Sequence, residues 1–332
     1  MRLKLIKIIW LLGLSCAFVF GGIGSSGAQF MQIGAGTKAI GMGSAYTAYA
    51  EGIDAIYWNP AGLVSLENNT HFSIGHVNYF ADMSFDNIAF TMPMFNGVIG
   101  FSGIGLFSGD IEITTVEEPE GTNETYTANE YAIGITYSTK LTDKFSAGVT
   151  LKLIHQGLAE LSADGWAMDL GAVYNTKIFN NLRFGFAILN FGPDLRYEGD
   201  DLIFRTRKDQ DQISQDEDAR AQYVTELYQL PLRLQIGIAI DVINMENQKI
   251  VATLDGINPN DQTETFGAGL EYTLFNRISL RAGYSKINEK DLTAGLSAMV
   301  GDPAETAMIV NYAYENHEYL GELHRFGIDF SF

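Results

Sequence analysis

The strongest constraint on the fold is a series of segments in which apolar and polar side chains alternate. From residue 70 to the end of the chain we count fourteen of them, each about ten residues long. They lie near 71–80, 85–93, 97–108, 126–138, 144–156, 165–176, 182–191, 230–242, 248–256, 264–274, 277–286, 291–300, 305–315 and 322–332. This length and period are typical of strands that cross an outer membrane. They predict an all-β fold, a 14-stranded antiparallel transmembrane β-barrel over residues 70–332.

A soluble β-sandwich also alternates, but three features weigh against it. The segments are longer than ordinary soluble strands, which have about 5–6 residues. Their apolar faces stay apolar from strand to strand, without edge charges. The chain also ends in an alternating segment with Phe332, the usual form of an outer-membrane assembly signal. The 35 glycines and the 12% of aromatic residues suit a barrel with a crowded lumen and aromatic interfaces.

The connections between these segments alternate between short and long. The short ones, expected to be periplasmic turns, are 94–96, 139–143, 177–181, 244–247, 275–276 and 301–304. The long ones, expected to be extracellular, are 109–125, 157–164 and 192–229, and the first and last are strongly acidic.

The longest connection carries a helix signal of its own. Ser214 to Glu217 resembles a capping box, which predicts a short helix over residues 219–228 with Tyr223 and Leu227 on one side. Two interpretations of the long loops stay open: solvated surface, or a lid or docking surface.

The first 28 residues predict a cleavable secretory signal. Arg2, Lys4 and Lys7 are followed by an apolar run over 8–20, and Ser26-Gly27-Ala28 precedes an expected cut before Gln29. The apolar run is shorter than the roughly 20 residues that span a bilayer. Removal of the signal takes away the only cysteine, Cys16, and moves the net charge from −19 to −22 by deleting three basic residues. We expect an outer-membrane location of the Gram-negative type, in contact with outer-membrane lipids, and no nucleic-acid partner.

Between the signal and the first strand lies a stretch that does not alternate. Ile33 to Leu63 is rich in glycine and alanine and carries only three charges, on Lys38, Glu51 and Asp54. Short helices broken at glycines are expected at its start, and Asn-Pro fixes a turn near its end. We therefore predict a compact plug over residues 29–69 inside the barrel. The residues singled out are Gly36, Gly41, Met42, Gly43, Tyr57, Trp58, Asn59, Pro60, Ala61 and Gly62.

This stretch also carries a family resemblance. Its turn, formed by Ala55, Tyr57, Asn59, Pro60, Ala61 and Gly62, resembles one shared by the PorV/PorQ proteins of Bacteroidetes-type outer membranes and by the FadL group of fatty-acid transporters. The preceding Gly36, Ala39, Gly41, Met42 and Gly43 look more like PorV/PorQ than FadL. The resemblance implies a 14-stranded barrel with an N-terminal plug.

The resemblance also implies two functions. The first is a non-catalytic component of type IX secretion that binds and shuttles secreted cargo proteins, in contact with other secretion subunits. The alternative is a FadL-type transporter of long-chain fatty acids or other hydrophobic small molecules. A transporter needs an apolar pocket above the plug and a kinked strand, which Gly100, Gly103 and Gly105 could permit. A general diffusion porin is disfavoured by the plug.

No pattern in the sequence indicates catalysis, a cofactor or a metal. The five histidines are scattered and have no ligand spacing with cysteines or carboxylates. The predicted lumen face carries charges of both signs, which predicts internal pairing that holds the plug rather than an ion-selective ring. These charges are Lys152, Arg183, Arg233, Arg277, Arg281, Arg325, Glu130, Asp169, Asp241, Asp255, Glu271 and Asp329.

Overall fold

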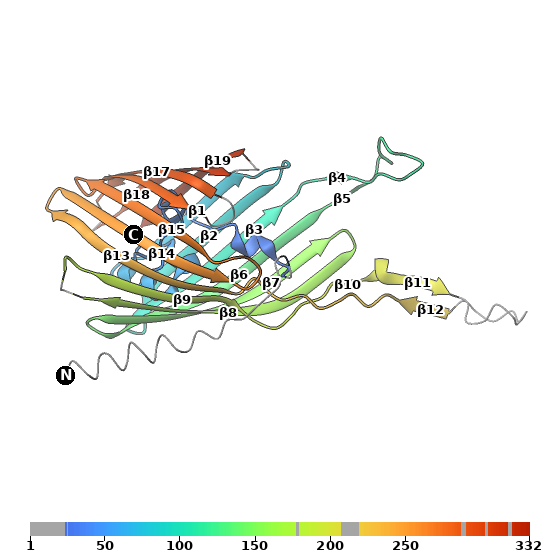
Figure 1. The fold of residues 1–332 in the computed structure, drawn as a ribbon, viewed down its shortest axis with the longest axis horizontal. Helices are drawn as coiled ribbons and strands as arrows, with labels where there is room; N and C mark the ends of the chain where they lie inside the picture. Colours follow the sequence, from blue (N-terminus) through green and yellow to red (C-terminus); the bar gives the residue numbers. More distant parts are fainter. Residues whose placement is uncertain are drawn as a thin grey trace, which may run out of the picture.

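The computed structural model describes residues 24, 26–176, 179–206, 219–286, 290–302, 305–317 and 321–332. Fourteen antiparallel strands form one closed barrel, which confirms the predicted fold class (Figure 1). They are β1 (His71–Asn78), β2 (Ser84–Met94), β3 (Gly97–Phe107), β6 (Ala128–Thr142), β7 (Phe145–Leu158), β8 (Leu161–Asn175), β9 (Arg183–Phe191), β13 (Arg233–Met245), β14 (Gln248–Pro259), β15 (Thr265–Leu274), β16 (Ile278–Ser285), β17 (Lys290–Gly301), β18 (Ala307–His317) and β19 (Gly321–Ser331).

The barrel closes where the two ends of the chain meet. β1 pairs with β19, with Phe72 opposite Phe330 and Ile74 opposite Ile328. Just beyond this ladder the Phe332 amide donates to the Thr70 carbonyl oxygen at 2.9 Å. On the other side β9 pairs with both β8 and β13. Every strand therefore has two neighbours, as a closed sheet in lipid requires.

The barrel is apolar outside and polar inside. In β13, Gln235 is fully buried and the next residue, Ile236, is 58% exposed. The same alternation runs around the wall, because exposed large side chains such as Ile133, Leu280 and Phe326 face outward. An apolar outer belt of this kind matches the lipid-facing surface of an outer-membrane barrel. No helix within the described ranges is both long and apolar enough to cross a membrane.

Two paired arms project beyond one end of the barrel, which we call the loop end (Figure 1). One arm pairs β4 (Ile111–Glu112) with β5 (Thr125–Tyr126). The other holds β10 (Glu198–Gly199), η3 (Asp200–Leu202) and the pair β11 (Ile203–Thr206) and β12 (Ala219–Gln222). The opposite end of the barrel, where β1 begins and β19 ends, is called the turn end.

Two details of the predicted loops are wrong. Residues 219–222 form β12 rather than the start of a helix, because they pair with β11 and the Tyr223 ring stacks on Phe204 at 4.5 Å. The capping-box residues themselves lie outside the described residues. The 157–164 connection is not a long loop, since β7 and β8 stay paired out to Leu158 and Leu161. Cross-strand partners such as His155 and Asp164, 2.7 Å apart, extend that hairpin.

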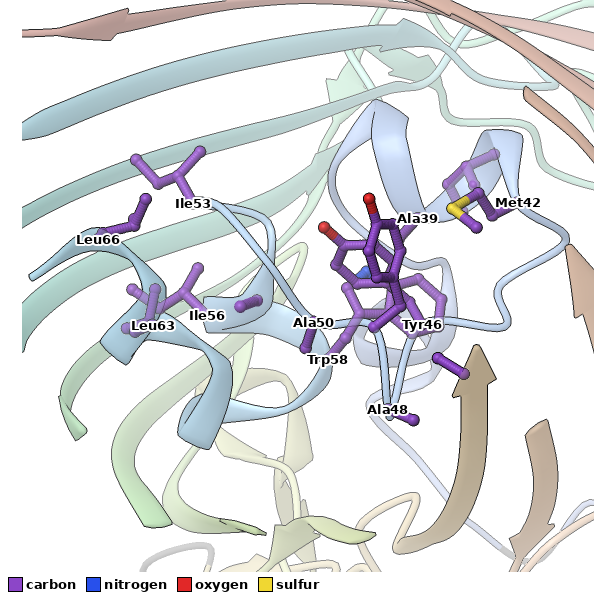
Figure 2. Packing of buried hydrophobic residues seen from close by; sticks show 14 of the residues in the cluster. Ala39, Met42, Tyr46, Ala48, Ala50, Ile53, Ile56, Trp58, Leu63 and Leu66 are labelled. Carbon is purple, nitrogen blue, oxygen red and sulfur yellow. The ribbon is translucent and has the colours of Figure 1, made fainter. Parts of the chain in front are cut away.

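The lumen is occupied by residues 26–66, which we call the inner segment. It consists of η1 (Gln29–Gln32), α2 (Thr37–Gly41), α3 (Ala55–Trp58) and η2 (Pro60–Leu66), joined by irregular stretches. Figure 2 shows apolar side chains of this segment, among them Met42, Tyr46 and Trp58, which belong to one buried cluster. Only residues 24 and 26–28 of the predicted signal lie among the described residues.

The apolar belt predicts where a charge is harmful. Leu280→Arg places a guanidinium on the outer face of β16, where its membrane cost is about 2–4 kcal/mol at mid-membrane. Leu141→Arg, also on an exposed leucine but near the turn end of β6, serves as the control and should cost about 0–1 kcal/mol. Urea unfolding in lipid vesicles measures both. Equal losses would mean that the belt is not the lipid-facing surface.

Candidate functional site

The Asn59-Pro60 turn ties the inner segment to the wall. Asn59 has an extended backbone (φ −153°), and its side-chain oxygen caps η2 by accepting from the Ala61 amide at 3.2 Å. Its side-chain nitrogen donates to the Thr47 carbonyl oxygen at 2.7 Å and to the Ala172 carbonyl oxygen of β8 at 3.2 Å. Pro60 begins η2, where a missing amide hydrogen costs nothing. One buried amide therefore links two parts of the inner segment to a strand.

Wall glycines make room for this turn. A Cβ atom on Gly171 of β8 would lie 2.1 Å from the Asn59 side-chain oxygen. A Cβ on Gly148 of β7 would lie 2.4 Å from the Pro60 carbonyl carbon. Within the segment, a Cβ on Gly62 would lie 1.9 Å from the Ala50 carbonyl oxygen. The close approach of backbone to backbone explains small residues on both sides of the contact.

The two aromatic residues before the turn are both bonded through their polar atoms. Trp58 Nε1 donates to the Ala35 carbonyl oxygen at 2.8 Å, and the Arg233 guanidinium lies 5.4 Å from the Trp58 ring. The Tyr57 hydroxyl donates to the Ile88 carbonyl oxygen of β2 at 2.7 Å. Each ring therefore packs within the lumen with its hydrogen-bonding capacity used.

The glycines upstream of the turn occupy positions that side chains would block. Gly36 has φ +84°, and a Cβ there would lie 2.3 Å from the Asp54 carboxyl carbon. Gly43 has φ +64°, and its amide donates to Thr293 Oγ1 at 2.9 Å. Gly41 packs against Gly295 of β17, because a Cβ on Gly41 would lie 3.0 Å from the Gly295 Cα atom. Met42, which separates Gly41 from Gly43 in the sequence, is fully buried.

Most of the lumen charges are paired. Lys152 bonds Asp169 at 2.8 Å, Arg281 bonds Glu271 at 2.5 Å, and Arg183 pairs with Asp241. Asp255 accepts from the Thr47 amide at 2.7 Å, Asp329 from Ser73 Oγ at 2.6 Å, and Glu130 from the Gln156 side chain. Arg277 lies apart from them, exposed at the turn end, and donates to the Gly301 carbonyl oxygen at 2.9 Å.

The inner segment contributes to this network directly. Arg183 also pairs with Glu51, and the Tyr49 hydroxyl donates to Glu271 at 2.5 Å. Arg325 donates to the Gly34 carbonyl oxygen at 3.0 Å. These contacts bind the segment to several strands at once.

Two buried acids in the network were missed from the sequence. Glu315 bonds Arg325 at 2.5 Å, although it falls at the edge of a predicted strand. Asp261 is 1% exposed and accepts from the side chains of Gln29 at 2.7 Å and Gln32 at 3.0 Å. Asp261 stands in a polar run after a strand, which looks like an ordinary loop, so no sequence signal marks it.

A cavity of about 540 Å³ opens at the loop end, beside the start of the inner segment. Its wall mixes apolar and polar side chains. They include Phe30, Ile33, Tyr79, Phe80, Met83, Leu106, Glu130, Gln262, Lys286 and His317. Below this mouth cavity the middle of the lumen is filled, because Ile40, Tyr46, Trp58 and Leu63 are at most 2% exposed. A separate cavity of about 330 Å³ opens toward the turn end, beside Lys38, Asp54 and Arg281. Among the described residues, no group of three or more acidic, histidine or cysteine side chains is arranged to hold a metal ion.

The wall beside the inner segment is unbroken at β3. All eleven residues of this strand pair with β2 and with β6, without a register shift. Gly100 faces the inner segment, where a Cβ would lie 2.8 Å from Ile56 Cδ1. Gly100 therefore makes room for the inner segment, and the strand has no bulge at Gly100, Gly103 or Gly105.

Comparison with known proteins decides the family. Residues 23–204, more than half of the chain, match the family described as type IX secretion system protein PorV. The chain belongs to the PorV family. This confirms the resemblance seen in the inner segment. A search of curated protein sequences found no significant match.

Solved structures with the same fold are FadL-type barrels. The Pseudomonas putida toluene transporter TodX is 12% identical, with a TM-score of 0.58 over 90% of this chain and 98% of TodX. The CymD monoaromatic hydrocarbon channel is 13% identical, with a TM-score of 0.57 over 90% of this chain and 97% of CymD. A Pseudomonas aeruginosa FadL homologue is 10% identical, with a TM-score of 0.53 over 89% of this chain and 97% of the homologue. Such likeness shows an outer-membrane barrel fold.

The close approach at Gly171 predicts a sensitive position in the wall. Gly171→Ala should loosen the inner segment, cost about 1–3 kcal/mol by overpacking, and raise small-ion conductance in planar bilayers. Gly256→Ala is the matched control, because nothing lies within 4 Å of a Cβ on that wall glycine. If both variants conduct and unfold alike, the Asn59 turn does not hold the segment.

A second prediction concerns pH. Burial, aided by the charge of Asp329, raises the pKa of Asp54 to about 7 from an unfolded value of about 3.9. The folded protein therefore binds this proton more tightly, and the free energy of unfolding should fall as the pH rises from about 4 to about 7. Asp54→Asn should flatten that slope in denaturant unfolding at pH 5 and pH 8. An unchanged slope would show that Asp54 does not titrate in this range.

Proposed function

We propose that this PorV-family protein is a non-catalytic outer-membrane component of type IX secretion that binds secreted cargo proteins at the loop end of its barrel. The observation that carries the proposal is the filled lumen. The inner segment is bonded to the wall at Arg183, Glu271 and Asp255, so its displacement would break all three bonds and deprive the buried Asp255 carboxylate of its amide donor. A barrel whose lumen is occupied in this way can act by binding a partner at its loop end rather than by conducting a solute.

The arms at the loop end provide the contact surface. Val116 on one arm is 99% exposed, and Tyr223, Val224 and Leu227 on the other are between 64% and 79% exposed. Exposed apolar side chains within strongly acidic segments suit an interface whose partner carries apolar and basic groups. This fits the cargo-binding role that the family resemblance implies.

The proposal includes the route to the membrane. Residues 1–28 act as a cleavable signal for export, and the mature chain begins at Gln29. Assembly then places the apolar belt in contact with outer-membrane lipids. The arms with their acidic side chains face away from the cell, where secreted proteins emerge.

A FadL-type transport function is the second candidate, favoured by the mouth cavity with its apolar wall of Phe30, Phe80 and Leu106. The unbroken β3 and the filled lumen weigh against it. Met83→Trp would obstruct the cavity, so protein-dependent uptake of a fatty acid or an aromatic hydrocarbon that falls in this variant would support transport. Uptake independent of the protein would exclude it.

Cargo recovery tests the leading proposal. Replacing Tyr223, Val224 and Leu227 together by serine should reduce co-purification of proteins with C-terminal secretion signal domains by at least about tenfold, or about 1.4 kcal/mol. Met245→Ser, an equally exposed apolar side chain at the turn end, is the control and should leave recovery unchanged. Undiminished recovery in the triple variant, with the barrel intact, would contradict binding through this arm.

A further inference from the structure

The residues just before Gln29 lie in a slot between two wall segments at the loop end. Ser26 pairs in parallel with Gln229, four residues before β13, and the Gly27 amide donates to the Gln229 carbonyl oxygen at 3.0 Å. On the other side the Gly24 amide donates to the carbonyl oxygen of Asp261, just beyond β14, at 3.0 Å. The two wall segments thus hold residues 24, 26 and 27 through backbone contacts.

Side chains add two further conditions to this slot. A Cβ on Gly27 would lie 2.2 Å from Cδ2 of the Tyr228 ring, and the Tyr228 hydroxyl is held by Gln156 Oε1 at 2.7 Å. The Ser26 hydroxyl donates to the Asp261 carboxylate, which is 1% exposed. The slot therefore favours glycine against Tyr228 and a hydrogen-bond donor against Asp261.

We propose that in the mature protein this slot binds a peptide segment of a secreted partner, in the place that residues 24 and 26–28 occupy. The inference rests on the proposed function and on signal removal at Ala28. That cut takes away the donors on Gly24, Ser26 and Gly27. It leaves the carbonyl oxygens of Gln229 and Asp261 without these amide donors. The Asp261 carboxylate loses the Ser26 hydroxyl and keeps its donors on Gln29 and Gln32, so a new peptide can take up the three vacated positions.

The slot defines the chemistry of its ligand. Backbone pairing accepts many sequences, while Tyr228 selects glycine at one position and Asp261 selects a hydroxyl or an amine at the preceding one. The strongly acidic loop end repels acidic peptides and attracts neutral or basic ones. The mouth cavity of about 540 Å³ adjoins the slot through Gln29 and Gln32, so residues flanking the bound segment can enter it.

The test uses mature protein purified from outer membranes, whose intact mass is measured first. Its ligand is a fluorescent peptide with the sequence of residues 24–28, followed by anisotropy titration. We expect saturable binding, at least tenfold weaker for the peptide with Gly27→Leu and for protein with Asp261→Asn, as loss of a charge-assisted hydrogen bond implies. Asp82→Asn changes an exposed carboxylate at the same end and should bind like the wild type.

A complementary change sharpens the result. Tyr228→Ala removes the ring that excludes a side chain, so the Gly27→Ala peptide should bind this variant more tightly than it binds the wild type. Should Asp261→Asn fail to assemble, the peptide series on wild-type protein still decides the question.

Three outcomes would overturn the proposal that the slot binds a peptide. They are a mature mass that retains residues 24–28, no peptide binding by the folded protein, or a peptide affinity that neither Gly27→Leu nor Asp261→Asn changes. The proposed function fails separately, through cargo recovery that does not depend on the arm. If cargo recovery depends on the arm but no peptide binds, the peptide-binding proposal fails and the proposed function stands.

Discussion

The structure depends on one constraint: a barrel with an apolar outer face must satisfy its polar inner face from within. The wall turns Arg183, Asp255 and Glu271 into the lumen, where each would be costly if left unpaired. The inner segment supplies Asp255 with the Thr47 amide. It also gives Arg183 and Glu271 further partners in Glu51 and the Tyr49 hydroxyl, beyond their wall partners Asp241 and Arg281. Wall and segment are therefore parts of one polar network, and neither is complete alone.

This constraint explains the composition of the inner segment and directs function outward. Backbone must approach backbone at Gly171 and Gly148, so bulky side chains are excluded there. The middle of the lumen is filled below the mouth cavity, while the arms with Val116 and Tyr223 remain open to a partner. A closed barrel with exposed apolar arms fits a secretion partner of the PorV family better than a conducting channel.

The sequence predicts the wall better than it predicts the loop end. Strands such as 230–242 can be predicted from the sequence because the membrane outside and the lumen inside require apolar and polar side chains to alternate at every residue. The predicted helix at 219–228 is wrong because the competing partner, β11, lies far enough along the chain that local propensity does not reveal it. Asp261 is invisible for a similar reason: its donors on Ser26 and Gln29 are more than two hundred residues away.

The central claim is that the protein meets its cargo at the loop end and keeps its lumen closed. The mature chain lacks cysteine if the signal with Cys16 is removed, so single cysteines can be placed at will. Val224→Cys on the arm and Met245→Cys at the turn end provide matched exposed positions for thiol cross-linking in intact cells. The account predicts cross-links to secreted proteins from Val224→Cys and none from Met245→Cys. Cross-links from the turn end alone would contradict it.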